Sequence, residues 1–150
     1  MDDKQAFLEL STILTGLTDP GFHSGTEERL FNDQTLTEYA RRLRGTFPDK
    51  FQALLDAYKT HGDVQPKPLL NDALLDSLRA TQVFKDNEIV AKQIVNIWYF
   101  SEYSDEAGAA SGALIDGGFY ERGAVWTVVK AHPIGFSTLL HGYWQREPAR

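Results

Sequence analysis

The sequence contains no cysteine, and this absence excludes several classes of protein at once. Without cysteine there is no disulfide scaffold, no cysteine nucleophile, no zinc ribbon and no iron–sulfur site. The chain also lacks a run of about 18 consecutive apolar residues, which a membrane-spanning helix requires. Its 150 residues, 42% of them hydrophobic, therefore predict one soluble globular domain, residues 1–150, that buries its own core.

Basic side chains are outnumbered by acidic ones, 15 against 21, which gives a formal net charge of -6. A nucleic-acid-binding domain of this size usually presents a basic face. The one basic cluster, Arg41, Arg42 and Arg44, lies among acidic neighbours and is typical of the solvated side of a helix. We therefore expect no nucleic-acid partner.

Apolar residues recur at helical spacing along most of the chain and predict an all-α fold, an irregular bundle of about six helices. The first helix is expected at about residues 3–16, ended by Gly16. Further helices are expected from a capping box at Thr35 to Glu38 to about Gly45, from Pro48 to Gly62, through Leu70, Leu74, Leu75 and Leu78, from Asp86 or Asn87 to about Tyr103, and from about Tyr120 to His132.

The remaining segments are predicted to be connections and a tail. Residues 18–34 are expected to form a loop with a short helical turn around Glu27 to Phe31, and glycines make residues 107–118 a flexible connection. No two alternating runs are joined by a hairpin signal, so the sequence gives only weak evidence for strands. Residues 133–150 are aromatic and non-periodic. They are expected to be ordered, either folded back onto the bundle or docked on another protein.

Patterns that carry chemistry are missing from the sequence. The four histidines, His23, His61, His132 and His141, form no metal-ligating pair, and His61 and His132 fall where helix ends favour a cation. The glycines of residues 108–118 follow a predicted helix rather than a strand and have no phosphate-loop lysine, which argues against a nucleotide site. No Gly-x-Ser-x-Gly elbow occurs. We expect no catalytic residue, no metal site and no cofactor in this chain.

Three segments taken together are similar to one known family. They are the opening Phe7-Leu8-Glu9-Leu10-Ser11-Thr12-Ile13-Leu14-Thr15-Gly16, the central Ile94-Val95-Asn96-Ile97-Trp98-Tyr99-Phe100, and the run from Ala124-Val125-Trp126 through His132-Pro133-Ile134-Gly135-Phe136 to Gly142-Tyr143-Trp144. In this order they resemble the small (gamma) subunit of bacterial FAD-dependent sugar and sorbitol dehydrogenase complexes. The likeness spans nearly the whole chain.

The resemblance implies a non-catalytic subunit. In such complexes the large subunit, a flavoprotein of the glucose-methanol-choline type, holds FAD and oxidises a sugar or polyol hydroxyl, and in many of them a cytochrome subunit accepts the electrons. The small subunit assists folding and maturation of the flavoprotein, and in several relatives a twin-arginine leader exports both. With the family in view, residues 133–150 become an expected docking tail.

The sequence departs from the family in three ways. Of the family's Phe-Gly-Tyr-Trp ending only Gly142, Tyr143 and Trp144 are kept. Relatives commonly carry cysteine near the position of Phe136 to Leu139, which this chain lacks, and no twin arginine precedes residue 7. We expect a periplasmic protein if a leader has been removed, and a cytoplasmic one if the chain is complete as given.

The expected partner-binding residues are aromatic, because aromatic side chains dominate interface energetics. The candidates are Trp126, Phe136, His141, Tyr143 and Trp144, together with Tyr99, whereas Trp98 is expected in the core because it shares a face with Ile94 and Ile97. The alternative is a stand-alone small-molecule binding protein or enzyme, with a pocket of several hundred Å³ lined by Trp and Tyr and with His141 as its polar group.

Overall fold

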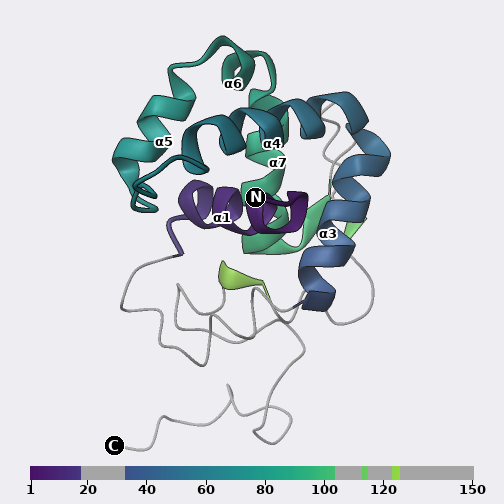
Figure 1. Ribbon diagram of the computed structural model, residues 1–150. Coiled ribbons are helices and arrows are strands. Elements are labelled where there is room, and N and C mark those ends of the chain that lie inside the picture. The colour runs from purple at the N-terminus through teal and green to yellow at the C-terminus, as the bar shows by residue number, and fades with distance from the viewer. Residues whose placement is uncertain (18–32, 104–112, 115–122, 126–150) are drawn as a thin grey trace, which may run out of the picture.

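The computed structural model describes residues 1–17, 33–103, 113–114 and 123–125 (Figure 1). In this part the predicted all-α class is confirmed, with the helices α1 (Asp3–Thr15), α3 (Asp33–Thr46), α4 (Pro48–Gly62), α5 (Asp72–Arg79), α6 (Gln82–Asp86) and α7 (Glu88–Phe100). The predicted turn at 27–31, most of the predicted helix 120–132 and the tail 133–150 lie outside the described residues. Ala124 and Val125, which belong to that last predicted helix, have helical backbone.

Helix α1 lies at the centre of the bundle, where it contacts α3, α4, α5 and α7 (Figure 1). The side chain of Asp2 caps its start by accepting a 2.7 Å hydrogen bond from the backbone N–H of Gln5. Gly16 ends it in the left-handed conformation, with φ of 68°, and donates its N–H to the carbonyl of Thr12. Both ends of the predicted first helix are confirmed within a residue.

The next two helices differ in how well local signals predicted them. Helix α4 begins at Pro48 and ends at Gly62, as expected from a proline in the first turn and a glycine at the end. The predicted capping box at Thr35 is wrong, because α3 already includes Asp33 and Thr35 is a buried residue inside the helix.

The region between α4 and α7 contains two helices where one was predicted. Asn71 caps α5 by accepting a hydrogen bond from the N–H of Leu74, so Leu70 precedes this helix and is not part of it. The short helix α6 was not predicted. The hydroxyl of Thr81 caps it by accepting a 3.1 Å hydrogen bond from the N–H of Phe84.

Helix α7 is shorter than predicted at its carboxyl end. It ends at Phe100, because Ser101 adopts the left-handed conformation with φ of 53°. The strand β1 (Glu102–Tyr103) follows and pairs antiparallel with β2 (Ala113–Leu114). The sequence did not predict this two-residue pair, whose second strand belongs to the glycine-rich connection. Nor is Asn87 a side-chain cap, since its amide donates instead to the carbonyl of Val83.

One hydrophobic core joins all six described helices. It is built around α1, α4 and α7, and its largest fully buried side chains are Trp98, Tyr39, Tyr58, Phe7, Phe47 and Phe51. Within the described ranges, no helix is long and apolar enough to cross a membrane.

Candidate functional site

The five residues predicted to bind a partner, Trp126, Phe136, His141, Tyr143 and Trp144, all lie outside the described residues. Their role stays a prediction. The structure does describe Trp98 and Tyr99 of the central segment of the resemblance, and Ala124 at the start of its last segment. Of these three positions, Ala124 is the nearest in sequence to the first candidate, Trp126. We therefore describe what each of the three contacts.

Trp98 is a core residue, as predicted. Its side chain is buried, and its ring lies edge-on to that of Tyr39, with 4.7 Å between ring centroids and an interplanar angle of 71°. The centroid of the Phe7 ring lies 6.2 Å from that of Trp98. Trp98 of α7 thus packs against residues of α1 and α3. It belongs to the core and not to a docking surface.

Tyr99 connects α7 to the end of α1. Its hydroxyl donates a 2.8 Å hydrogen bond to the carbonyl of Thr15, in the last turn of α1. Its ring packs against Leu17 and Ala124, which are both buried. Burial raises the pKa of the Tyr99 phenol, so it remains a donor at neutral pH. We call Leu17, Tyr99 and Ala124 the junction, because they come from three segments that are distant in the sequence.

Polar contacts order the chain beside the junction. The hydroxyls of Ser101 and Tyr39 lie 3.1 Å apart in a buried hydrogen bond, which joins the end of α7 to α3. The amide of Gln93 donates a 3.2 Å hydrogen bond to the carbonyl of Glu102. The neighbouring Phe100 remains 42% exposed. The carboxyl end of α7 is thus fixed on one side and leaves an aromatic ring in solvent on the other.

A buried carboxylate lies at a separate place, between α1, α4 and the connection that follows α4. Glu9 is 3% exposed. It accepts hydrogen bonds from the hydroxyl of Tyr58 at 2.9 Å and from the amide of Gln5 at 2.6 Å, and it forms an ion pair with Lys67. Burial alone would raise the pKa of Glu9, but the bonds from Lys67, Gln5 and Tyr58 outweigh it and hold that pKa below its ordinary value.

Sequence reasoning missed the buried group around Glu9. Its partners Tyr58 and Lys67 are 49 and 58 residues away in the chain, so no local pattern joins them. The one signal available was the place of Glu9 between Leu8 and Leu10 in an otherwise apolar stretch of the first helix. A carboxylate there needs partners, since a buried charge is costly unless paired.

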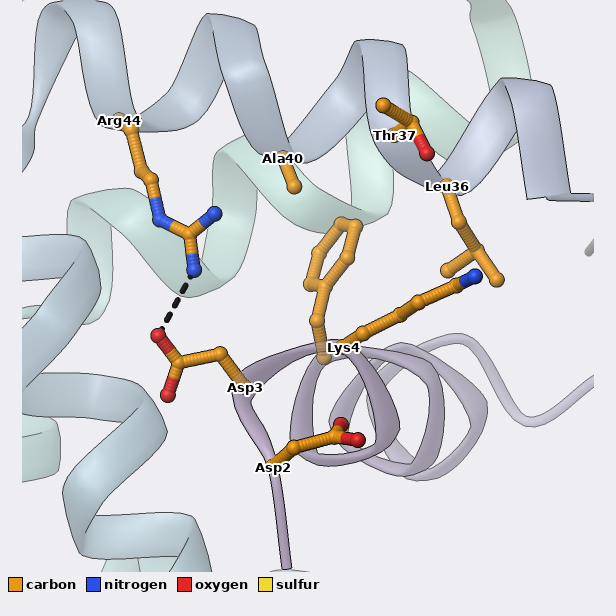
Figure 2. A pocket seen from close by; sticks show the side chains of 8 residues that line it. Asp2, Asp3, Lys4, Leu36, Thr37, Ala40 and Arg44 are labelled. Atoms are coloured by element: carbon orange, nitrogen blue, oxygen red, sulfur yellow. Dashed lines mark hydrogen bonds and ion pairs between the residues drawn. The ribbon is translucent and has the colours of Figure 1, made fainter.

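A hollow of 330 Å³ lies between the first turn of α1 and helix α3 (Figure 2). Arg44 reaches down from α3 and binds Asp3 at 2.8 Å, while Lys4 extends below Leu36. The residues that line it are Asp2, Asp3, Lys4, Phe7, Leu36, Thr37, Ala40 and Arg44. Phe7 is its one aromatic side chain, so this hollow differs from the pocket of Trp and Tyr in our alternative hypothesis.

Three of the four charged side chains that line the hollow form ion pairs, and the fourth, Asp2, caps α1. Asp3 binds Lys59 as well as Arg44, and these bonds hold the pKa of Asp3 below its ordinary value. Lys4 pairs with Asp33. The hollow therefore presents no surplus of either charge to a ligand.

Two further predictions concern polar side chains. The basic cluster is exposed at Arg41 and Arg44, as predicted, whereas Arg42 is half-buried. Arg41 and Arg42 pair with Glu38 within α3, and Arg44 pairs with Asp3 of α1. His61 lies in the last turn of α4 with its Nδ1 2.9 Å from the carbonyl of Ala57, as predicted for a helix-end histidine. Among the described residues, no group of three or more histidine, aspartate or glutamate side chains could hold a metal ion.

Comparison of the chain with known protein families, with characterised proteins and with solved structures gives no match.

Proposed function

We propose that this chain is the non-catalytic small subunit of an FAD-dependent sugar or polyol dehydrogenase complex. In this proposal it binds the flavoprotein catalytic subunit, of the glucose-methanol-choline type, and assists its folding, maturation or export. FAD and the oxidation of the substrate hydroxyl belong to the partner, and a cytochrome subunit is a further member expected in such a complex.

The junction is the observation that supports the proposal most directly. The resemblance rests on three segments that are far apart in the sequence, and each contributes a neighbour at this one place. Thr15 belongs to the first, Tyr99 to the second and Ala124 to the third. The three segments of the resemblance therefore lie beside one another, as they would if the pattern reflects a fold shared with the family.

The residues of the three resembling segments are proposed to have two different roles, one in the core and one in binding the partner. Phe7, Leu10, Ile97 and Trp98 are buried and build the bundle. The later candidates, Trp126, Phe136, His141, Tyr143 and Trp144, follow the junction along the chain and are proposed as the contacts with the flavoprotein. Large aromatic side chains are the usual anchors of such interfaces, because they bury much area at a small entropic cost.

A truncation tests this function. We expect a chain ending at Pro133 to keep the helical bundle, because all residues of the described core precede that position. It should no longer co-purify with the flavin-containing dehydrogenase from the native host, which the full chain should retain. The readouts are the helical circular dichroism of the truncated chain and the flavin absorbance of the captured protein.

A matched control separates the tail from general damage. Lys92→Met removes a surface ion pair with Glu88 on α7, where both side chains are more than half exposed, and it should leave co-purification unchanged. Capture of the dehydrogenase by the folded, truncated chain would reject residues 134–150 as the docking tail. Ligand binding by the isolated full chain, with no flavoprotein captured, would favour the stand-alone binding protein instead.

A further inference from the structure

Residues 64–70 cross from the end of α4 to the start of α5 without helix or strand, and we call them the strap. The strap carries Pro66 and Pro68, and two of its apolar side chains face solvent: Val64 is 46% and Leu69 is 77% exposed. Leu70 packs against the core at the far end. At the near end, Asp63 pairs with the amino group of Met1.

The middle of the strap is tied to the bundle by one charged contact. The ammonium group of Lys67 reaches the buried carboxylate of Glu9 on α1 and binds its Oε1. The Lys67 side chain is itself 52% exposed, while that of Glu9 is only 4% exposed. The contact therefore joins an exposed segment to an interior charge, and its strength depends on the charge of Glu9.

We infer that Lys67 and Glu9 form a charge-dependent latch: with Glu9 ionised the strap lies against α1, and when Glu9 is protonated the strap leaves α1 while the bundle stays folded.

The other groups around Glu9 do not provide a second charged partner for it. Tyr58 from α4 and Gln5 from α1 are neutral donors, and Tyr58 stays protonated because burial and the bond to Glu9 raise its pKa. Among the charged side chains of α4, Lys59 pairs with Asp3 and Asp56, His61 lies against the carbonyl of Ala57, and Asp49 and Lys50 are exposed. The charged side chains of the other helices packed on α1 bind elsewhere or face solvent. In the described part of the chain they pair as Glu38 with Arg41 and Arg42, Arg44 with Asp3, Asp33 with Lys4, Asp76 with Arg79, and Glu88 with Lys92, and Asp72 is exposed.

Protonation is expected to act locally. A neutral Glu9 no longer carries the cost of a buried charge, and it can keep its bonds with Tyr58 and Gln5. Lys67 loses its ionic partner and gains more from full hydration in water. Helices α1, α4 and α7 keep their apolar contacts with one another, and the strap keeps its own apolar contact with the core through Leu70 at its far end.

Backbone ¹⁵N relaxation on the full chain tests the latch. At pH 7 the amides of Gln65, Lys67 and Leu69 should have rigid order parameters of about 0.85, and these should fall below about 0.6 as acid protonates Glu9. The Cδ chemical shift of Glu9 reports its own protonation, and both changes should share one midpoint. Because that carboxyl is held below its ordinary pKa of 4.5, the midpoint should lie below this value.

Variants separate Glu9 from the other acids that titrate in the same range. Glu9→Gln and Lys67→Met should each loosen the strap at pH 7, with amide dispersion in α1 and α7 preserved. The matched control Lys92→Met breaks an exposed ion pair and should leave the strap rigid. A strap that stays rigid through the titration of Glu9 and in both variants overturns the latch. So does a strap that loosens only when α1 and α7 unfold with it.

Discussion

The hydroxyl of Tyr99, near the end of α7, donates a 2.8 Å hydrogen bond to the carbonyl of Thr15, at the end of α1. This carbonyl belongs to the last turn of its helix, where carbonyl groups have no partner within the helix. Tyr99 thus both satisfies the end of α1 and fixes the place where Leu17 and Ala124 meet.

Replacing Tyr99 should weaken the bundle in two distinguishable steps. Tyr99→Phe removes only the bond to Thr15 and should cost about 1 kcal/mol of unfolding free energy. Tyr99→Ala should cost more, because the ring also packs against Leu17 and Ala124. Urea denaturation measures both, with Leu69→Ala as a control at an exposed apolar position. Equal stability of wild type and Tyr99→Ala would contradict this role.

Trp98→Ala should be among the most damaging single changes, with a loss of about 3–5 kcal/mol of unfolding free energy. The reason is its position among Phe7 and Tyr39, where truncation opens a cavity between three helices. Trp98→Phe should lose less. Denaturant unfolding followed by circular dichroism gives the comparison, and a loss below 1 kcal/mol for the alanine variant would show that Trp98 is not a core residue.

Gly62, at the end of α4, and Gly45, within α3, should respond in opposite directions to replacement by alanine. A Cβ at Gly62 would lie 2.8 Å from Cζ of the Tyr58 ring, so Gly62→Ala must displace the ring that holds Glu9 and should cost about 1–3 kcal/mol. A Cβ at Gly45, within α3, meets nothing within 4 Å, so Gly45→Ala should stabilise the protein by about 0.5–1 kcal/mol. Thermal unfolding of the two variants measures both effects, and Gly45→Ala serves as the control for Gly62→Ala. A Gly62→Ala variant as stable as the wild type would contradict the close contact with Tyr58.

Glu38 should contribute stability that is lost in acid. Hydrogen bonds from Arg41 and Arg42 lower its pKa from 4.5 to about 2, although partial burial opposes them. Because the folded pKa is the lower one, the contribution is complete above pH 4.5 and disappears as the pH falls towards 2. Solvent screening limits it to about 1 kcal/mol or less at pH 7.

The measurement for Glu38 is the urea midpoint of wild type and Glu38→Gln at pH 7 and at pH 2. The difference between the two proteins should be present at pH 7, smaller at pH 2 and reduced by 1 M salt. A difference that is the same at both pH values would show that the loss comes from packing rather than from the charge.

How far the sequence predicts the fold depends on whether the cause is local. The bounds of α1 and α4 were predictable because Gly16, Pro48 and Gly62 act on their own neighbours. The end of α7 was not, because Ser101 takes its left-handed conformation beside a hydrogen bond to Tyr39, 62 residues earlier. Helix α6 is only five residues long and offers too few positions for a periodic pattern.

In the candidate site, too, features with a local cause were predictable from the sequence and those that depend on distant residues were not. The burial of Trp98 followed from its spacing to Ile94 and Ile97 on one helix face. The buried ionic contact of Glu9 with Lys67 could not be predicted, since it depends on how the strap returns to α1. The junction was equally hidden, because it requires three distant segments to meet.

Co-expression with the flavoprotein tests the central claim, the role of a small subunit, most directly. The proposed partner, a glucose-methanol-choline type dehydrogenase of the native host, should be produced with and without this chain, and its soluble yield, flavin content and elution on size exclusion compared. We predict that the chain co-elutes with the dehydrogenase and raises the soluble, flavin-loaded fraction. A dehydrogenase that is equally soluble and flavin-loaded without the chain, and elutes apart from it, would contradict the account.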